Sequence, residues 1–506
     1  MIPPQDFRVL ITYANLAGML VVSVAVGLFT SILRKAGYQV DLFESTFYAT
    51  DETTSPDNRV KFLQARPFNY DDWGVAFKTD LLGDYRRKVE DFAPDLILYH
   101  TVEDTWLQAV NLAECIRDLE IPSVFGGIFT TSAPEKALAF SAVSMIGVGE
   151  GETIVSEVAE RVRTGRDVAD VPGLWIKRVD GTIIRNARGA LEDINKPLPD
   201  YSLFDEKRFY RPMGGKILKT VPLETYRGCS YQCTFCSSPL HVTEAKSLGL
   251  GDFRRAKRMD RLAEEIQYLI SRHSPDIFYV IDDSFLARPD SDLDALADLY
   301  AQFRVPFWFN TRPENIDPKN LDRLRRMNAW RMSVGVECGN QDFRFKYLKR
   351  YSSNAKLLKH FDWIRHADFA WSVNNVIGFP DETRSLVFET IEFNRKIIGS
   401  DSLTVSIFTP YSGTELRTLA EQKGYLDPAT ITTHTTSSSL LDMPPPYLSQ
   451  SDIDQLMRTF ALYVAMPKER WSEIERAESE DAVFAELQKE YRQAVWGDDP
   501  ERGGMP

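Results

Sequence analysis

Strand and helix patterns alternate along most of this 506-residue chain, and this alternation constrains its fold more than any other feature. In the first third, helical patterns separate short apolar runs, which predict strands at residues 8–13, 39–43, 95–99, 122–125 and 144–148. Such alternation is typical of a parallel sheet with helices on both faces, whose ligands bind beyond the carboxyl ends of the strands. We therefore predict a doubly wound, Rossmann-like N-terminal domain over residues 1–164.

One uncharged apolar stretch, residues 16–33, is nearly long enough to span a bilayer. It contains Gly18, Ser23 and Gly27, lies between two predicted strands, and is followed by Arg34, Lys35 and a glycine. That order is typical of a loop and a capped helix inside a sheet domain. We therefore expect neither a membrane span nor a signal sequence here.

The alternation resumes after a hairpin and linker at residues 165–217, where Asp180-Gly181 separates two short strands and Pro197 and Pro199 follow. Six strands are then predicted at residues 221–225, 277–281, 306–310, 331–337, 371–377 and 403–408. Polar side chains follow nearly every strand, and that end carries the chemistry in β/α barrels. The pattern predicts a partial (β/α)6 barrel over residues 218–425 and a small helical C-terminal region over residues 426–506.

The net charge and the cysteine content limit the classes of function that the chain can have. The formal net charge is −13 and no long basic run is present, so we expect no nucleic-acid partner. Five cysteines in so long a chain do not make a disulfide scaffold. Three of them cluster while Cys115 and Cys338 stand alone, which indicates a metal site in a reducing, cytoplasmic compartment.

The clustered cysteines, Cys229, Cys233 and Cys236, have the spacing C-x3-C-x2-C directly after a predicted strand. Three thiolates are too few to close a tetrahedral zinc site alone, although His241 or Cys338 would supply a fourth ligand. They suit a [4Fe–4S] cluster that leaves one iron open. The cluster is the preferred interpretation, and zinc is the alternative.

This cysteine motif, with an aromatic residue before its last cysteine and at the start of a β/α barrel, resembles that of the radical S-adenosylmethionine (SAM) superfamily. The resemblance implies that SAM chelates the open iron. One electron from the cluster would then cleave SAM to methionine and a 5′-deoxyadenosyl radical, which abstracts a hydrogen atom from the substrate. A flavodoxin- or ferredoxin-type protein is the expected electron donor to the cluster.

The same resemblance implies a set of SAM-binding residues in and after the barrel strands. The family's Gly-Gly-Glu after the second barrel strand is missing here, so the assignment to either of two aspartates stays open. The residues implied are Phe235, Asp282, Asp283, Glu337, Ile377 and Gly378.

The N-terminal glycines resemble the cobalamin-binding domain that is fused to one large radical SAM branch. The cobalamin residues implied by this resemblance are Asn15, Thr101, Gly126, Gly127, Thr130, Gly149 and Glu150. The sequence lacks the D-x-H-x-x-G motif that gives histidine to cobalt in other cobalamin domains, so cobalt would have no protein imidazole ligand. The alternative is the same fold without a bound corrin.

The leading hypothesis is a cobalamin-dependent methyltransferase acting on a carbon or phosphorus centre of a small molecule. A cobalamin-dependent cyclase or rearrangement enzyme shares all these motifs, and a non-enzymatic cobalamin or iron–sulfur sensor is a further alternative. A methylthiotransferase acting on transfer RNA is disfavoured, because that family carries a second cysteine triad. No catalytic residue is identified. The candidate pocket residues are Asn310, Arg312, Asn374 and Tyr411.

Overall fold

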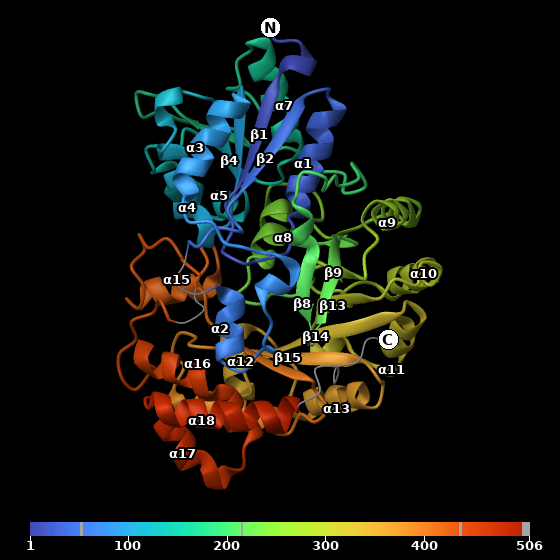
Figure 1. Cartoon of the computed structure of the whole chain (residues 1–506), viewed down its shortest axis with the longest axis vertical. Helices are drawn as coiled ribbons and strands as arrows, with labels where there is room; N and C mark the ends of the chain where they lie inside the picture. Colours follow the sequence, from blue (N-terminus) through green and yellow to red (C-terminus); the bar gives the residue numbers. More distant parts are fainter. Residues whose placement is uncertain (51–53, 214–215, 435–437, 498–506) are drawn as a thin grey trace.

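The computed structural model of the protein describes residues 1–50, 54–213, 216–434 and 438–497. Figure 1 shows three parts stacked along the longest axis: an N-terminal sheet domain, a curved second sheet, and a layer of C-terminal helices. The two sheets contain seven strands each within these described ranges. This arrangement confirms the predicted fold class.

The N-terminal sheet has the strand order β2-β1-β3-β4-β5-β6-β7. The first five strands in sequence are parallel, and the predicted hairpin adds β6 and β7 in antiparallel orientation. The strands are β1 (Arg8–Tyr13), β2 (Gln39–Glu44), β3 (Leu96–His100), β4 (Ser123–Gly126), β5 (Met145–Gly147), β6 (Leu174–Lys177) and β7 (Ile183–Arg185).

Helices cover both faces of this sheet because β1 is apolar on both sides. Val9 and Ile11 pack into one core cluster, and Leu10 between them packs into another on the opposite face. The helices of this part are α1 (Val24–Lys35), α3 (Leu81–Phe92), α4 (Trp106–Glu114), α5 (Ile128–Ser132), α6 (Pro134–Leu138) and α7 (Glu152–Thr164).

The apolar stretch at residues 16–33 forms a loop and then α1, as predicted. The Ser23 side chain caps α1 by accepting a hydrogen bond from the Val26 amide (3.4 Å), and Arg34 and Lys35 lie in the last turn. Among the described residues, no helix combines the length and the apolar character needed to cross a bilayer.

The second sheet is the partial barrel, with the strand order β16-β15-β14-β13-β12-β9-β8. Its six parallel strands confirm the six predicted strands, and β8, which the sequence did not predict, pairs antiparallel with β9. The strands are β8 (Tyr210–Met213), β9 (Lys216–Leu223), β12 (Ile277–Val280), β13 (Phe307–Thr311), β14 (Ala329–Glu337), β15 (Ala370–Ile377) and β16 (Ser402–Ile407).

Side chains alternate between the inside and the outside of this barrel. On β13, Phe307 and Phe309 join the main hydrophobic core, whereas Trp308 and Asn310 line a cavity. The helices that connect the strands are α9 (Met259–His273), α10 (Asp290–Tyr300), α11 (Pro318–Arg326), α12 (Gln341–Leu348), α13 (Asn354–Arg365), α14 (Arg384–Asn394) and α15 (Glu415–Gln422).

The C-terminal helices pack on the last strands of the barrel. They share one hydrophobic core with Ile377 and Ile407, at the ends of β15 and β16. The helices are α16 (Gln450–Ala465), α17 (Trp471–Ala477), α18 (Asp481–Tyr491) and the short η8 (Arg492–Trp496).

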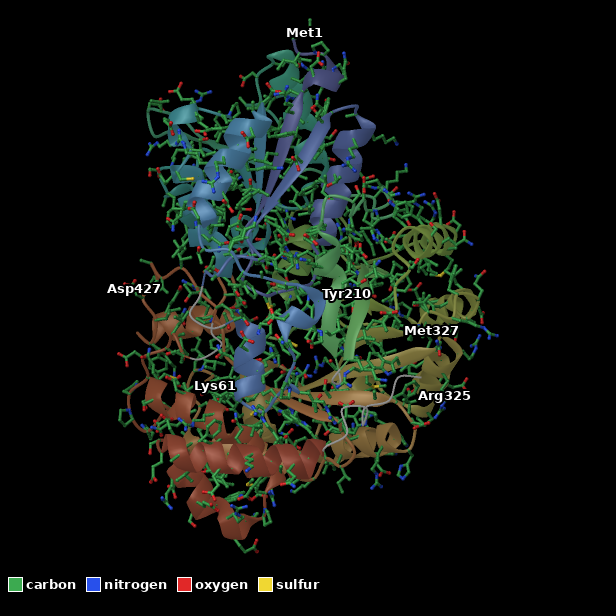
Figure 2. All side chains as sticks on the ribbon, viewed as in Figure 1. Met1, Lys61, Tyr210, Arg325, Met327 and Asp427 are labelled. Atoms are coloured by element: carbon green, nitrogen blue, oxygen red, sulfur yellow. The ribbon has the colours of Figure 1, made fainter. Side chains whose placement is uncertain are left out.

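A segment of the first 164 residues also packs on the barrel. Helix α2 (Ser55–Lys61) is followed by Phe62 and Leu63, which lie in the core of the C-terminal helices. Gln64 Oε1 then accepts a hydrogen bond from the Val405 amide on the edge strand β16 (3.2 Å). Figures 1 and 2 show α2 and Lys61 beside the barrel and far from Met1. The segment therefore covers an otherwise open sheet edge.

Candidate functional site

The cysteine loop lies between two short elements, β10 (Tyr226–Arg227) and α8 (Ser238–Ser247). Strand β10 pairs with β11 (Arg255–Ala256). Asp282 anchors the start of the loop: its carboxylate accepts hydrogen bonds from the amides of Thr225 (2.8 Å) and Tyr226 (3.0 Å) and forms an ion pair with Arg288. These partners make Asp282 a structural support of the loop.

The loop brings the three cysteines into one region. Cys236 Sγ accepts a hydrogen bond from the Ser238 amide (3.5 Å), and Arg312 Nη1 lies 3.6 Å from Cys233 Sγ. Burial raises the pKa of Cys229 to about 11 and that of Cys236 to about 12, so the free thiols are protonated at neutral pH. Within the described ranges, no three histidine, cysteine or acidic side chains are close enough to hold a metal ion as they stand.

The two residues that would complete a zinc site have other contacts. His241 stacks on Phe253, with ring centroids 5.4 Å apart, and the buried Cys338 Sγ accepts a hydrogen bond from Thr390 Oγ1 (3.8 Å). In the part of the chain that the structure describes, neither residue joins the cysteines in a metal-binding group. A donor set of three thiols on one loop fits a [4Fe–4S] cluster better than zinc.

Two of the candidate SAM residues lie near the thiols. Asp283 is solvent-accessible and accepts a hydrogen bond from Ser238 Oγ (2.8 Å). Desolvation by the surrounding protein raises the pKa of its carboxyl, and the neighbouring Asp282 raises it further. Phe235 packs against Phe379 at 6.0 Å between ring centroids, next to Cys236 in sequence.

Glu337 ends β14 with a strained backbone, since its φ is 66° and the pairing with β15 shifts register there. Its carboxylate accepts a hydrogen bond from Arg350 (2.8 Å) and lines the barrel cavity. Arg350 also lies near Cys233, where its charge lowers the pKa of the thiol against the larger effect of burial, which raises it. Glu337 and Arg350 therefore connect the cavity to the cysteine loop.

Ile377 ends β15, and Gly378 directly follows the strand. Ile377 is fully buried in the core of the C-terminal helices, and Gly378 has a φ of +82°. The Gly378 amide donates to Glu382 Oε2 (2.6 Å), and burial raises the pKa of Glu382 to about 8. The turn after β15 is therefore held by a buried carboxyl group that the sequence did not single out.

Open space lies at the ends of β3 and β4, where the sequence predicts corrin contacts. A Cβ atom built at Gly126 would meet no atom within 4 Å. The Thr101 hydroxyl is buried and has no hydrogen-bond partner among the described residues, while its amide donates to the Gly126 carbonyl (3.0 Å). An unpaired buried hydroxyl beside open space fits a bound ligand at this edge.

Other candidate cobalamin residues have structural contacts. A Cβ at Gly127 would lie 1.9 Å from the Thr101 carbonyl oxygen, so this glycine allows close backbone packing. Thr130 Oγ1 donates to the Gly147 carbonyl (2.6 Å), and Asn15 Nδ2 donates to Thr46 Oγ1 (2.9 Å). These residues shape the loops around the open space.

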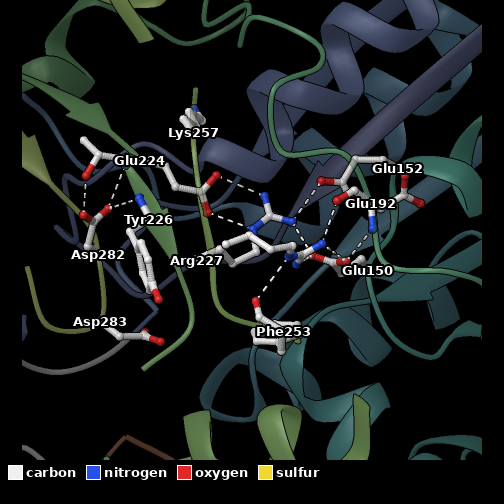
Figure 3. A network of polar contacts seen from close by, with 12 residues as sticks. Glu150, Glu152, Glu192, Glu224, Tyr226, Arg227, Phe253, Lys257, Asp282 and Asp283 are labelled. Carbon is white, nitrogen blue, oxygen red and sulfur yellow. Dashed lines mark hydrogen bonds and ion pairs between the residues drawn. The ribbon is translucent and has the colours of Figure 1, made fainter. Parts of the chain in front are cut away.

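Gly149 and Glu150 lie where the N-terminal sheet meets the cysteine loop. A Cβ at Gly149 would lie 2.8 Å from the Arg188 guanidinium. Glu150 forms ion pairs with Arg227 and Arg255, both at 2.5 Å, and Figure 3 shows this network. Burial raises the pKa of Glu150, but the two guanidinium groups outweigh it and hold the pKa below its usual range. Glu150 therefore joins the two domains.

A cavity of about 570 Å³ extends from the loop after β1 into the barrel. Gly18 and Val21 line it on the N-terminal side, and Asn310 and Asn374, two of the predicted pocket residues, line it inside the barrel. Arg312 lies instead beside the cysteines, and Tyr411 Oη donates to Asp104 (3.0 Å) at the domain interface.

Sequence reasoning missed several residues that line the cavity: Arg59, Arg211, Tyr279, Trp308 and Arg331. Period-two alternation along residues 306–310 would have placed Trp308 on the same side as Asn310. No sequence signal connects Arg59 with the barrel, since α2 lies between strands of the other domain.

Comparisons with known proteins agree with this geometry. Residues 223–393 match the family model of the radical SAM superfamily. An uncharacterized methyltransferase, PH0819 of Pyrococcus horikoshii, is 24% identical over 346 residues, which cover 66% of this chain and 71% of that protein. The ribosomal protein uS12 methylthiotransferase RimO of Petrotoga mobilis is 22% identical over 271 residues, 51% of this chain and 58% of that protein.

A solved structure matches along almost the whole chain. The radical SAM methyltransferase TsrM from Kitasatospora setae, with cobalamin and a [4Fe–4S] cluster bound, superposes with a TM-score of 0.64 at 14% identity. The match covers 97% of this chain and 99% of that chain. At this identity the similarity establishes the fold alone.

The cysteine loop and most of the partial barrel thus lie within residues 223–393, the segment that matches the radical SAM superfamily model. The N-terminal sheet, barrel and C-terminal helices together have the architecture of TsrM.

Proposed function

We propose that this protein is a cobalamin-dependent radical SAM methyltransferase that acts on a carbon or phosphorus atom of a small molecule. The observation that carries the proposal is the position of the barrel cavity. It extends from the loop after β1, in the candidate cobalamin domain, to Glu337, which is linked through Arg350 to the cysteine loop. A substrate in this cavity would lie between the two candidate cofactor sites.

The residues that would hold the cofactors follow from the donor chemistry. Cys229, Cys233 and Cys236 would hold a [4Fe–4S] cluster, and the open space at Gly126, with the Thr101 hydroxyl, would hold cobalamin. When bound, the cluster with SAM and cobalamin would supply one-electron cleavage of SAM and a transferable methyl group.

The chain's own charges would orient SAM beside the cysteines. Arg312 contacts Cys233 and packs over the Tyr231 ring at 3.7 Å, while Asp283 lies on the side of Cys229 and Cys236. Cationic and anionic side chains on two sides of the loop complement a carboxylate and an ammonium group.

The decisive test is a product analysis under anaerobic conditions. The protein is reconstituted with iron, sulfide and hydroxocobalamin and incubated with dithionite and methyl-labelled SAM. A methyltransferase of this class is expected to form both 5′-deoxyadenosine and S-adenosylhomocysteine, whereas the Cys233→Ala variant forms no 5′-deoxyadenosine. Without any 5′-deoxyadenosine from the wild type, the sensor alternative holds and the enzyme proposal fails.

The same products separate the remaining alternatives. Formation of 5′-deoxyadenosine without S-adenosylhomocysteine would favour a cyclase or rearrangement enzyme. A methylthiotransferase would also need a second group of cysteines, and the sequence has only Cys115 and Cys338 outside the triad. We further propose a flavodoxin- or ferredoxin-type electron donor and a cytoplasmic location, since the cluster needs a reducing compartment.

A further inference from the structure

Two arginines line the barrel cavity without an acidic partner among the described residues. Arg211 lies on β8 and Arg59 on α2, so they reach the cavity from different parts of the chain. Neither forms an ion pair with a carboxylate within the ranges that the structure describes. The cavity therefore contains two guanidinium groups whose charges are not neutralised by those ranges.

The surroundings of Arg211 leave it able to bind a ligand. Its guanidinium lies 5.0 Å from the centroid of the Trp308 ring and 5.6 Å from that of Tyr279. Its Nη1 atom is buried and has no hydrogen-bond partner among the described residues. Desolvation lowers the pKa of Arg211, and the charge of Arg59 lowers it further. The two cations are thus near enough to repel each other.

Arg59 has few hydrogen-bond partners among the described residues. Its Nη1 atom donates one long hydrogen bond, to Gln64 Oε1 at 3.4 Å. The Arg59 side chain is exposed to solvent where it lines the cavity, and desolvation by the surrounding protein lowers the pKa of its guanidinium.

Several buried arginines of this chain form ion pairs, whereas the buried Arg344 donates to carbonyl and amide oxygens. Arg331 lines the same cavity but forms an ion pair with Asp401 and donates to Ser402 Oγ (2.9 Å). The fully buried Arg208 pairs with Glu44 at 2.7 Å.

Arg59 is exposed and Arg211 is partly buried, and neither pairs with a carboxylate of the described residues. Because a buried donor without a partner is costly, Arg211 Nη1, with a second cation in the same cavity, indicates a site for an anion.

We propose that Arg211 and Arg59 bind an oxyanion of the substrate, which is a carboxylate or a phosphate-type group. A guanidinium group presents two parallel N–H donors to such an anion. The stacked rings of Trp308 and Tyr279, with centroids 4.2 Å apart, form a flat surface on which the Arg211 guanidinium packs. This inference rests on the proposed function and narrows its substrate to an organic acid or phosphorus ester.

Binding of small probes to the reconstituted protein tests the site without knowledge of the substrate. Isothermal titration compares benzoate and phenylphosphonate with neutral benzamide. We expect the anions to bind and benzamide not to bind. Tighter binding of benzoate would indicate a carboxylate site, and tighter binding of phenylphosphonate would indicate a site for a phosphorus oxyanion.

Variants assign the binding to the two arginines. Arg211→Gln and Arg59→Gln are each expected to raise the Kd of the preferred probe by about ten-fold or more, which is typical of a lost charged hydrogen bond. The exposed Arg272→Gln variant is the control and keeps the wild-type Kd. Benzamide binding as tight as that of the anions, or an equal loss of SAM affinity in Arg211→Gln, overturns the proposal.

Stability gives a second readout. Arg211→Met removes a charge that no carboxylate of the described residues neutralises, so the Tm is expected to stay unchanged or to rise. Arg331→Met leaves Asp401 without its ion-pair partner and is expected to lower the Tm. An equal fall in both variants assigns Arg211 a structural role and overturns the proposal. The wild type's 5′-deoxyadenosine reports separately on the proposed function. If the wild type cleaves SAM but binds no anion probe, the inference alone fails.

Discussion

The Arg227 guanidinium lies two residues before Cys229 and forms an ion pair with Glu150 of the N-terminal sheet domain at 2.5 Å. The same guanidinium bonds Glu224 through Nε (2.9 Å) and Nη2 (3.0 Å) and also pairs with Glu152 (3.2 Å). Figure 3 shows the three carboxylates around this single cation. The start of the cysteine loop is therefore tied to the other domain by electrostatics.

Removal of the Arg227 charge should destabilise the protein. Arg227→Met would leave Glu150, Glu152 and Glu224 mostly buried with fewer positive partners, and breaking such a group costs about 3–5 kcal/mol. Thermal unfolding should show a clear fall in Tm. The control is Arg254→Met, because Arg254 is exposed and pairs with Asp252 on the surface. Equal effects of the two substitutions would contradict the interpretation.

Glu382 should make stability depend on pH. Burial raises its pKa from 4.5 to about 8, so the native protein holds a proton that the unfolded chain releases between these values. Its contribution to stability is therefore fully present below about pH 4.5 and is lost as the pH rises through 8.

The Glu382→Gln variant should lose this pH dependence, because glutamine stays neutral. Relative to the wild type, its free energy of unfolding should rise between pH 5 and pH 9, on the order of a few kcal/mol. Thermal unfolding measured between pH 5 and pH 9 checks this prediction, and the exposed Glu486→Gln variant is the control. A constant difference between Glu382→Gln and wild type across the range would speak against a raised pKa.

The two neighbouring glycines after β4 should respond differently to substitution. Gly127→Ala should destabilise the protein by about 2 kcal/mol or more, since its φ is +137° and the added Cβ would lie 1.9 Å from the Thr101 carbonyl. Gly126→Leu points into open space, so the fold should remain, while uptake of hydroxocobalamin should fall about ten-fold. Wild-type corrin uptake by a folded Gly126→Leu variant would exclude the proposed corrin position.

Iron content should depend on three cysteines and not on the others. The variants Cys229→Ala, Cys233→Ala and Cys236→Ala should each lose most iron and acid-labile sulfide after anaerobic reconstitution. Cys115→Ala should keep the full content, because Cys115 lies at the end of α4 and contacts the Leu112 carbonyl (3.1 Å). Full iron content in any of the triad variants would remove that residue from the ligand set.

The strands of both sheets were predictable because short apolar runs, such as residues 8–13, alternate with helical patterns and turn residues along the sequence. A strand of a parallel sheet is buried on both faces, and so most of its residues are apolar. The role of individual polar residues was harder to infer. Asp282 and Asp283 are adjacent in the sequence, but one accepts hydrogen bonds from two amides while the other lies beside the thiols. Only the backbone geometry at the end of β12 separates them.

Strand β8 and helix α2 were not predictable for a different reason. Residues 210–213 form a short strand that contains a proline, which local propensity disfavours, and only pairing with β9 stabilises it. The contact between Gln64 and Val405 spans 341 residues of sequence. Such long-range contacts leave no periodic pattern in either segment.

Helix α2 also limits how this protein can be divided. A fragment that begins at residue 165 would contain every barrel strand, yet it would lack Arg59 and the partner of the Val405 amide. It would expose the outer edge of β16 and the surface that Phe62 and Leu63 cover, a combination that favours aggregation. One wall of the barrel cavity thus comes from a segment that lies between strands of the N-terminal domain, and the two domains are expected to fold as a unit.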